Sequence, residues 1–200
     1  TAAFAAMVAL HSGVGQVVDV NLLTTIFQMM GPVISLYKLS GELQPRLGSG
    51  LPYTVPRGVY QCMDGKWVGV SASSDTVAAR VMKILGLETD ERFTTFGGRM
   101  EYRELLQELM GKWCATRTRD EVVAIFEEAE AAVGPVFDMS DIASDPHYAA
   151  RNMIQTVGDT PMQGLIAELS KTPGVLHNEG RPIDADRDDI TTHGWLNQSS

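Results

Sequence analysis

The fold of the N-terminal part is decided by the stretch GVGQVVDVNLL, residues 13–23. Its two glycines follow an apolar run over residues 2–10, and glycine readily adopts the left-handed conformation that ends a helix. Residues 16–20 are rich in valine, which favours a short strand, and Asn21 is a suitable N-cap for a following helix. Because the early part has no polar face, we expect a helix, a strand and a helix inside a layered α/β domain.

A Gly-x-Gly sequence beside a strand also invites a nucleotide-binding interpretation. The dinucleotide fingerprint, however, follows a strand and opens a helix. Gly13 and Gly15 follow a predicted helix and open a predicted strand. This order of elements disfavours a nucleotide-binding turn.

The composition is that of a globular protein, with 44% hydrophobic and 20% charged residues in a chain of 200. That length allows one ordinary domain, or one small domain plus pieces of another. The formal net charge of −9 leaves no basic face to neutralise phosphates, so we expect no nucleic-acid partner. No apolar run approaches the length of a membrane span and no signal-peptide pattern is present, so we expect no membrane partner.

The four histidines and two cysteines show no recognised metal or catalytic pattern. Cys62 and Cys114 match neither CxxC nor zinc spacing, so we interpret them as buried, reduced thiols of a cytoplasmic protein. The histidines lack metal-ligand spacing, and we expect neither a metal site nor a catalytic residue in this chain. Helix capping explains the carboxylates of Asp138, Asp141 and Asp145 more simply than acid–base catalysis does.

Glycine and proline accumulate between residues 41 and 58, where the helical periodicity is lost. This composition indicates a linker. We therefore assign residues 1–40 to the end of a large α/β domain and residues 41–58 to the connection that leads from it to a second domain.

The linker is also the best candidate for a binding site. Gly48 and Gly50 can bring main-chain N–H groups close to an acyl or carboxylate group. Tyr53 belongs to the same segment, and Arg57 can pair with a carboxylate. A plain interdomain tether explains the spacing equally well.

Residues 59–151 predict a compact small domain of the α+β type. Two strand patterns are joined by Asp64-Gly65, which is a strong hairpin signal, and helical patterns follow. Thr118 and Glu121 have the spacing of a capping box. A segment of this size can carry its own apolar core.

Residues 152–200 change to short strand-like pieces and then to a polar tail. The apolar pieces at 154–157, 165–169 and 174–177 alternate with glycine and proline turns, which is typical of strands. The acidic stretch from Asp184 onward is expected to fray.

Several segments together carry a resemblance to a known family. They are GVGQVVDVNLLTTIF, SGLPYTVPRGVYQCMDGKWVGVSA, RFTTFGGRMEYRELL, VGPVFDMSDIASDPHYAARNM and, more weakly, TPGVLHNEGRPIDAD. In this order they resemble the C-terminal half of the class III CoA-transferases, the group of formyl-CoA transferase, carnitine-CoA transferase and the acyl-CoA racemases. The resemblance implies a fragment of a Rossmann-like large domain plus a small domain, with residues 152–200 returning to the large domain.

The resemblance also implies a chemistry. Such enzymes transfer CoA between carboxylic acids through an aspartyl-CoA thioester, and the family's nucleophilic aspartate lies a little before the position of Thr1. Acyl-CoA and a carboxylic acid are then substrates, no cofactor is tightly bound, and the chain alone is expected to be inactive. Family members are interlocked homodimers, so the expected partner is a second copy or an upstream half. The linker lacks the longer glycine run of formyl-CoA transferases, which disfavours formyl and oxalyl substrates.

Two other interpretations stay open. The same fold carries acyl-CoA racemases, whose acid–base pair also lies upstream, so these residues cannot separate racemase from transferase. Alternatively, the chain is a truncated, non-catalytic interaction module. Because residues 1–40 are too apolar to face water, we expect an isolated chain to self-associate through this segment.

Overall fold

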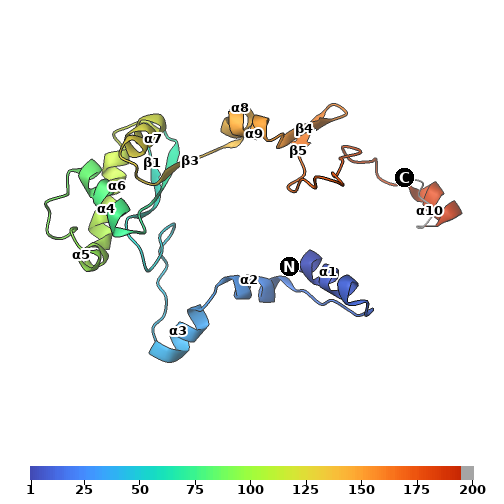
Figure 1. The fold of residues 1–200 in the computed structure, drawn as a ribbon, viewed down its shortest axis with the longest axis horizontal. Coiled ribbons are helices and arrows are strands. Elements are labelled where there is room, and N and C mark those ends of the chain that lie inside the picture. Colours follow the sequence, from blue (N-terminus) through green and yellow to red (C-terminus); the bar gives the residue numbers. More distant parts are fainter. Residues whose placement is uncertain (195–200) are drawn as a thin grey trace. The chain divides into compact units, whose positions relative to one another are not determined.

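A computed structural model describes residues 1–194 of the chain, and Figure 1 labels its helices and strands. The chain divides into two compact units, Thr1–Gly134 and the part that begins at Pro135. This division differs from the predicted boundaries at residues 40, 58 and 151, which stay predictions. Helices and strands occur in both units, so the fold is mixed α/β.

The first forty residues form three helices: α1 (Ala2–Ser12), α2 (Leu22–Met29) and α3 (Val33–Ser40). The predicted caps are confirmed. Gly13 ends α1 in the left-handed conformation with φ of 70°, and the Asn21 side chain accepts a hydrogen bond of 2.8 Å from the Thr24 N–H. The chain turns at Gly31-Pro32, and α2 and α3 are separate helices bent by 67° relative to each other.

The structure differs from the predicted helix–strand–helix order at residues 16–20. This segment runs between α1 and α2 with neither helix nor strand. A strand is defined by main-chain hydrogen bonds to a neighbouring strand, and no described strand pairs with these residues. Valine content alone therefore did not suffice to make a strand.

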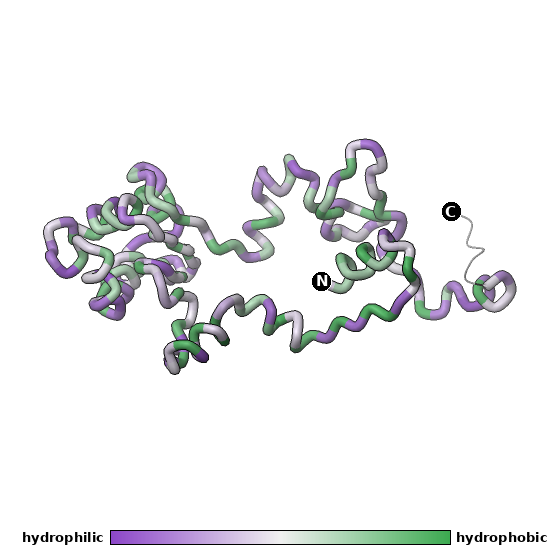
Figure 2. Tube along the Cα trace, turned by 60° about the horizontal axis from the view of Figure 1, so that its bottom comes forward, coloured by the Kyte–Doolittle hydropathy of each residue, from purple (hydrophilic) through white to green (hydrophobic). Residues whose placement is uncertain are grey.

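The N-terminal helices bury nothing within the described chain. No residue of α1, α2 or α3 is buried, and large apolar side chains such as Val17 and Leu39 are 93% and 89% exposed. Figure 2 shows the hydrophobic colouring that recurs along this segment. Many exposed apolar side chains within one segment are typical of a face that another protein segment covers.

Within residues 1–194 no single helix is long and apolar enough to cross a membrane. Only the bent pair α2 and α3 together meets the length and composition of a span.

A three-stranded sheet has the order β1 (Arg57–Gln61), β2 (Trp67–Ser71), β3 (Val133–Val136). Strands β1 and β2 belong to the first unit, and β3 begins in it and ends just after the boundary at Gly134. Strands β1 and β2 are antiparallel, with Val59 opposite Gly69. The predicted hairpin turn is confirmed: Gly65 has a φ of +78°, and its N–H donates to the Cys62 carbonyl at 3.0 Å.

Four helices accompany the sheet: α4 (Asp75–Leu85), α5 (Phe96–Glu101), α6 (Arg103–Cys114) and α7 (Arg119–Glu128). Helix α6 packs against β1 and helix α7 against β2, while α4 contacts both helices. Side chains cap the starts of α4 and α7, and Thr118 and Glu121 form the predicted capping box.

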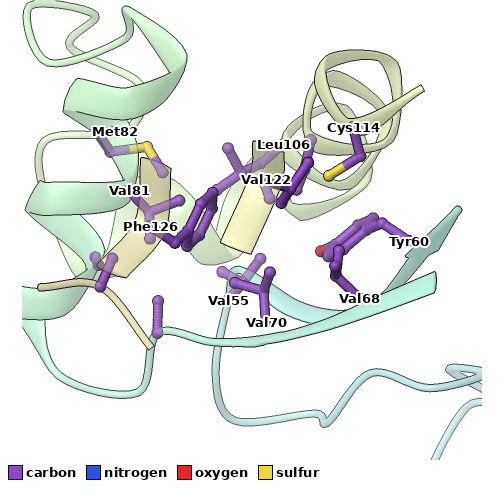
Figure 3. Packing of buried hydrophobic residues seen from close by; sticks show 14 of the residues in the cluster. Val55, Tyr60, Val68, Val70, Val81, Met82, Leu106, Cys114, Val122 and Phe126 are labelled. Carbon is purple, nitrogen blue, oxygen red and sulfur yellow. The ribbon is translucent and has the colours of Figure 1, made fainter. Parts of the chain in front are cut away.

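The apolar core lies between these helices and the sheet. Figure 3 shows Phe126 of α7 with Val81 of α4 and Leu106 of α6, above Val70 of β2. All four side chains are buried. The edge of the Trp113 ring packs against Phe126 with 5.8 Å between ring centroids. Every buried residue of the described chain lies between positions 54 and 131.

The second unit contains α8 (Met139–Ser144), α9 (Pro146–Ala150), the antiparallel hairpin β4 (Ile154–Val157) and β5 (Thr160–Gln163), and α10 (Arg187–His193). Asp138 and Asp145 cap α8 and α9, which confirms the capping interpretation of these carboxylates. The predicted strands at 165–169 and 174–177 do not form, because no described strand offers them a partner. Part of the predicted fraying tail is the helix α10, and residues 195–200 lie outside the described chain.

Replacing Leu106 with alanine is expected to lower the free energy of unfolding by about 2–5 kcal/mol, because the buried side chain leaves a cavity. The matched variant Leu39→Ala is expected to change it by no more than about 0.5 kcal/mol, because that side chain is exposed. Urea unfolding of the dilute chain, followed by tryptophan fluorescence, measures both. Equal losses at the two positions would contradict this location of the core.

Candidate functional site

Part of the predicted linker borders a pocket of about 500 Å³ in the first unit. Its lining comes from three elements: the loop 46–51, residues 58–60 of β1, and Arg103, Glu104 and Gln107 of α6. The volume lies within the range of small-molecule sites. This is the candidate site.

Helical periodicity explains why α6 contributes these side chains. Leu106 and Met110 are four residues apart, and both are fully buried in the core. Arg103 and Gln107 have the same spacing and line the pocket with their neighbour Glu104. One helix therefore anchors itself with its apolar face and supplies the polar wall of the pocket with another.

Two side-chain hydrogen bonds hold the loop 46–51 in place. Ser49 Oγ accepts a bond of 2.9 Å from the N–H of Val59, which ties the loop to β1. Arg103 Nη2 donates to the carbonyl oxygen of Leu51 at 2.8 Å, which ties the loop to α6. The loop thus has a defined position relative to both structured walls.

Gln107 joins the strand to the helix at the floor of the pocket. Its Nε2 donates to the carbonyl oxygen of Arg57 at 2.9 Å, and its Oε1 accepts a hydrogen bond from the hydroxyl of Tyr60. Burial raises the pKa of Tyr60, with a smaller contribution from Cys114, so the phenol keeps its proton at neutral pH. The Tyr60 hydroxyl is therefore a stable donor.

Two glycines have a structural role at this site. Gly48 has a φ of +59°, a conformation that residues with a side chain rarely adopt. A Cβ atom added at Gly58 would lie 3.3 Å from the Tyr60 hydroxyl and 3.4 Å from Ser49 Oγ. Gly48 thus permits the turn of the loop, and Gly58 allows the strand to approach Tyr60 and Ser49 closely.

The lining carries two cations and one carboxylate. Arg103 is partly buried and uses one nitrogen for the loop, whereas Arg46 is exposed and has no hydrogen bond or ion pair with any described residue. Glu104 is the only carboxylate of the lining. Guanidinium groups bind carboxylates through paired N–H donors, so the pocket is suited to a small anion.

The structure separates the four predicted binding residues. Gly48 and Gly50 line the pocket, but Tyr53 and the side chain of Arg57 do not. Tyr53 is 67% exposed, and Arg57 Nη1 donates to Ser73 Oγ at 3.5 Å. No observation tests whether any of the four binds substrate, so these roles stay predictions.

Arg46 and Arg103 were missed by sequence reasoning. Arg46 lies two residues before Gly48, so proximity to the glycine-rich loop was an available signal for it. Arg103 is fifty-two residues after Leu51, the loop residue it contacts, and no local pattern connects the two. Only the packing of α6 on β1 brings Arg103 to the loop.

Neither cysteine is suited to nucleophilic catalysis. Both Cys62 and Cys114 are buried, and burial raises the pKa of Cys114 to about 12. Burial also raises the pKa of Cys62, with a further contribution from the nearby Asp64 carboxylate. Among residues 1–194, no group of three or more His, Cys, Asp or Glu side chains is placed to hold a metal ion.

The two thiols are expected to react with Ellman's reagent at pH 8 only after the protein unfolds, because the thiolate is the reactive form and both pKa values are raised. Native protein is expected to release almost no chromophore, and protein in guanidinium is expected to release two equivalents, one for each cysteine. Rapid reaction of one thiol in the native protein would contradict this assignment.

The chain matches one protein family over nearly its whole length. The profile of CoA-transferase family III matches residues 1–186. The chain is 35% identical to the succinyl-CoA–D-citramalate CoA-transferase of Chloroflexus aurantiacus, over 86% of this chain and 46% of that enzyme. It is 29% identical to the alpha subunit of the succinyl-CoA–L-malate CoA-transferase of the same organism, over 86% of this chain and 42% of that subunit.

A solved structure shows the same fold. The similarity to a CaiB/BaiF family protein of Brucella suis has a TM-score of 0.76 at 22% identity, over 94% of this chain and 50% of that protein. The chain spans about half the length of the curated relatives and of this structure. Because the family profile covers almost all of its residues, the chain belongs to CoA-transferase family III.

Proposed function

We propose that the complete protein is a CoA-transferase that moves CoA from an acyl-CoA thioester to a second carboxylic acid. The observation that carries this proposal is the family match over residues 1–186. This chain contributes the small domain and the linker, and residues 1–40 and 152–200 belong to a Rossmann-like large domain. Acyl-CoA is a substrate of this reaction and not a resident cofactor.

The proposed reaction uses an aspartate in the half of the family domain that this chain does not span. Its carboxylate attacks the acyl-CoA carbonyl, which forms a mixed anhydride and releases CoA thiolate. The thiolate attacks the aspartyl carbonyl, which forms the aspartyl-CoA thioester and frees the first acid. The second acid attacks this thioester, and the released thiolate then attacks the acyl carbonyl of the new anhydride. The products are the new acyl-CoA and the free aspartate.

The residues of this chain bind and orient in that scheme. Arg46 and Arg103 supply positive charge for a carboxylate substrate, and the fixed loop 46–51 supplies a rigid rim. A mixed anhydride is sensitive to water, so a rim that limits the access of water protects it. The relatives act, by their names, on succinyl-CoA and on citramalate or malate. Small dicarboxylic acids are therefore the first substrates to test.

A chimera tests the proposal. We expect that a protein joining the first half of the Chloroflexus succinyl-CoA–D-citramalate CoA-transferase to Thr1 of this chain converts succinyl-CoA and citramalate to succinate and citramalyl-CoA. The chain alone is expected to give no product, because it lacks the proposed nucleophile. Liquid chromatography of the CoA esters measures both. The control is the same chimera with its nucleophilic aspartate replaced by alanine.

Other outcomes would overturn the transferase proposal. Deuterium exchange at the carbon next to the thioester of a 2-methylacyl-CoA, without CoA transfer, would indicate a racemase. A folded chimera without activity toward any acyl-CoA would favour the non-catalytic interaction module. CoA transfer by this chain alone would show that the nucleophile lies within it.

We also propose a homo-oligomer, on the basis of the exposed apolar residues of the N-terminal segment 1–40. Light scattering is expected to show a mass that rises above 21.8 kDa with concentration. Both leucine side chains are more than four-fifths exposed. The double variant Leu22→Glu, Leu39→Glu is expected to reduce this association, because it places negative charges on the apolar surface. A monomer over a wide concentration range would contradict self-association.

The cytoplasmic location stays a prediction.

A further inference from the structure

We propose that the pocket between the loop 46–51, β1 and α6 binds one carboxylate group of the substrate through Arg46 and Arg103. In the proposed transferase reaction, this carboxylate is the one that does not become attached to CoA. The assignment of the bound group to a dicarboxylic acid therefore rests on the proposed function. The binding of a carboxylate by the pocket itself does not.

The argument begins with the unused donors of the two guanidinium groups. Arg46 makes no contact with the described chain that would compensate its charge, and Arg103 gives only Nη2 to Leu51 and to the sulfur of Met100. An arginine has five N–H donors, so most of them stay available. Two guanidinium groups on one pocket favour an anion with several acceptor oxygens.

The partial burial of Arg103 increases the value of such a contact. The same side chain holds the loop through the carbonyl oxygen of Leu51, so its guanidinium is already fixed by a hydrogen bond of 2.8 Å. A fixed donor loses less conformational entropy on binding than a free one does. Arg103 is therefore a preorganised donor, whereas the exposed Arg46 is the one that adjusts to the ligand.

The formal charge of the lining is matched by a single carboxylate. Glu104 lines the same pocket as the two arginines, so the three side chains have a formal charge of +1. One carboxylate neutralises this charge, whereas a phosphate dianion leaves the pocket with a net charge of −1. We therefore expect a carboxylate in this pocket, and the competition experiment below compares it with a phosphate.

The substrates named for the relatives contain a second carboxyl group of this kind. Succinate, malate and citramalate each carry two carboxyl groups, and only one of them forms the thioester. The other keeps its charge throughout the reaction. An enzyme that discriminates dicarboxylic from monocarboxylic acids needs a cationic subsite for that second group, and this pocket supplies one.

Binding to the 200-residue chain tests the site without any turnover. Equilibrium dialysis is expected to show that radiolabelled succinate binds and that unlabelled succinate displaces it. Neither succinamide nor adenosine 3′,5′-bisphosphate is expected to displace it. Succinate is expected to slow the modification of Arg46 and Arg103 by phenylglyoxal, mapped by mass spectrometry. Binding of the bisphosphate in place of succinate would overturn the carboxylate assignment.

Three variants are expected to change succinate binding differently. Arg46→Gln is expected to weaken it about tenfold, because the variant loses a charge-assisted hydrogen bond to succinate. Arg46 is exposed, so we expect the fold to tolerate this change. Glu104→Gln is expected to strengthen binding, because it removes the only carboxylate of the lining. The matched control Arg151→Gln removes one exposed positive charge outside the pocket and is expected to leave binding unchanged. Equal effects of Arg46→Gln and Arg151→Gln would overturn the site.

The chimera separates this inference from the proposed function. If the chimera transfers CoA, Arg46→Gln is expected to raise the KM for citramalate about tenfold. The KM for acetyl-CoA, a donor without a free carboxylate, is expected to stay unchanged. Transfer that is insensitive to Arg46→Gln would refute the subsite and keep the transferase. Succinate binding that depends on Arg46, in a chimera without transfer, would refute the transferase and keep the site.

Discussion

Burial of apolar side chains between positions 54 and 131 is the constraint on which the rest of this structure depends. Phe126, Leu106 and Val81 are fully buried where α4, α6 and α7 meet the sheet, and no residue of the described chain is buried outside this interval. Hydrophobic stabilisation is roughly proportional to the apolar area removed from water. The small domain therefore supplies its own stability. No residue of the apolar helices α1, α2 and α3 is buried in the described chain, and we expect these helices to gain stability by contact with another protein segment.

The candidate site follows from that core. Leu106 and Met110 fix helix α6 in the core, and this packing places Arg103 and Gln107 at the pocket. Their hydrogen bonds in turn fix the loop and the strand end. A lost core contact on α6 thus disturbs the site through displacement of Arg103. The geometry of the pocket is a consequence of packing and not of the loop sequence alone.

What the sequence predicted well is what depends on neighbours along the chain. The cap at Asn21, the Asp64-Gly65 turn and the capping box at Thr118 each involve residues within about three positions of one another, and all are present. Strand predictions failed at 16–20, 165–169 and 174–177, because a strand exists only with a partner that its own sequence does not specify. The site was predicted in part for the same reason. Gly48 and Gly50 are marked by local composition, but Arg103 reaches the loop from another element.

Within the proposed function, a binding site for the free carboxylate that is separate from the nucleophile has a chemical advantage. A guanidinium group beside a nucleophilic carboxylate forms an ion pair with it, which lowers its basicity and occupies the donors that the substrate needs. Here Arg46 lies in the linker loop and Arg103 on α6 of the small domain, and the only carboxylate of the pocket lining is Glu104. The substrate then brings its own carboxylate to these cations, and the reacting carboxyl group at its other end stays available for the aspartate.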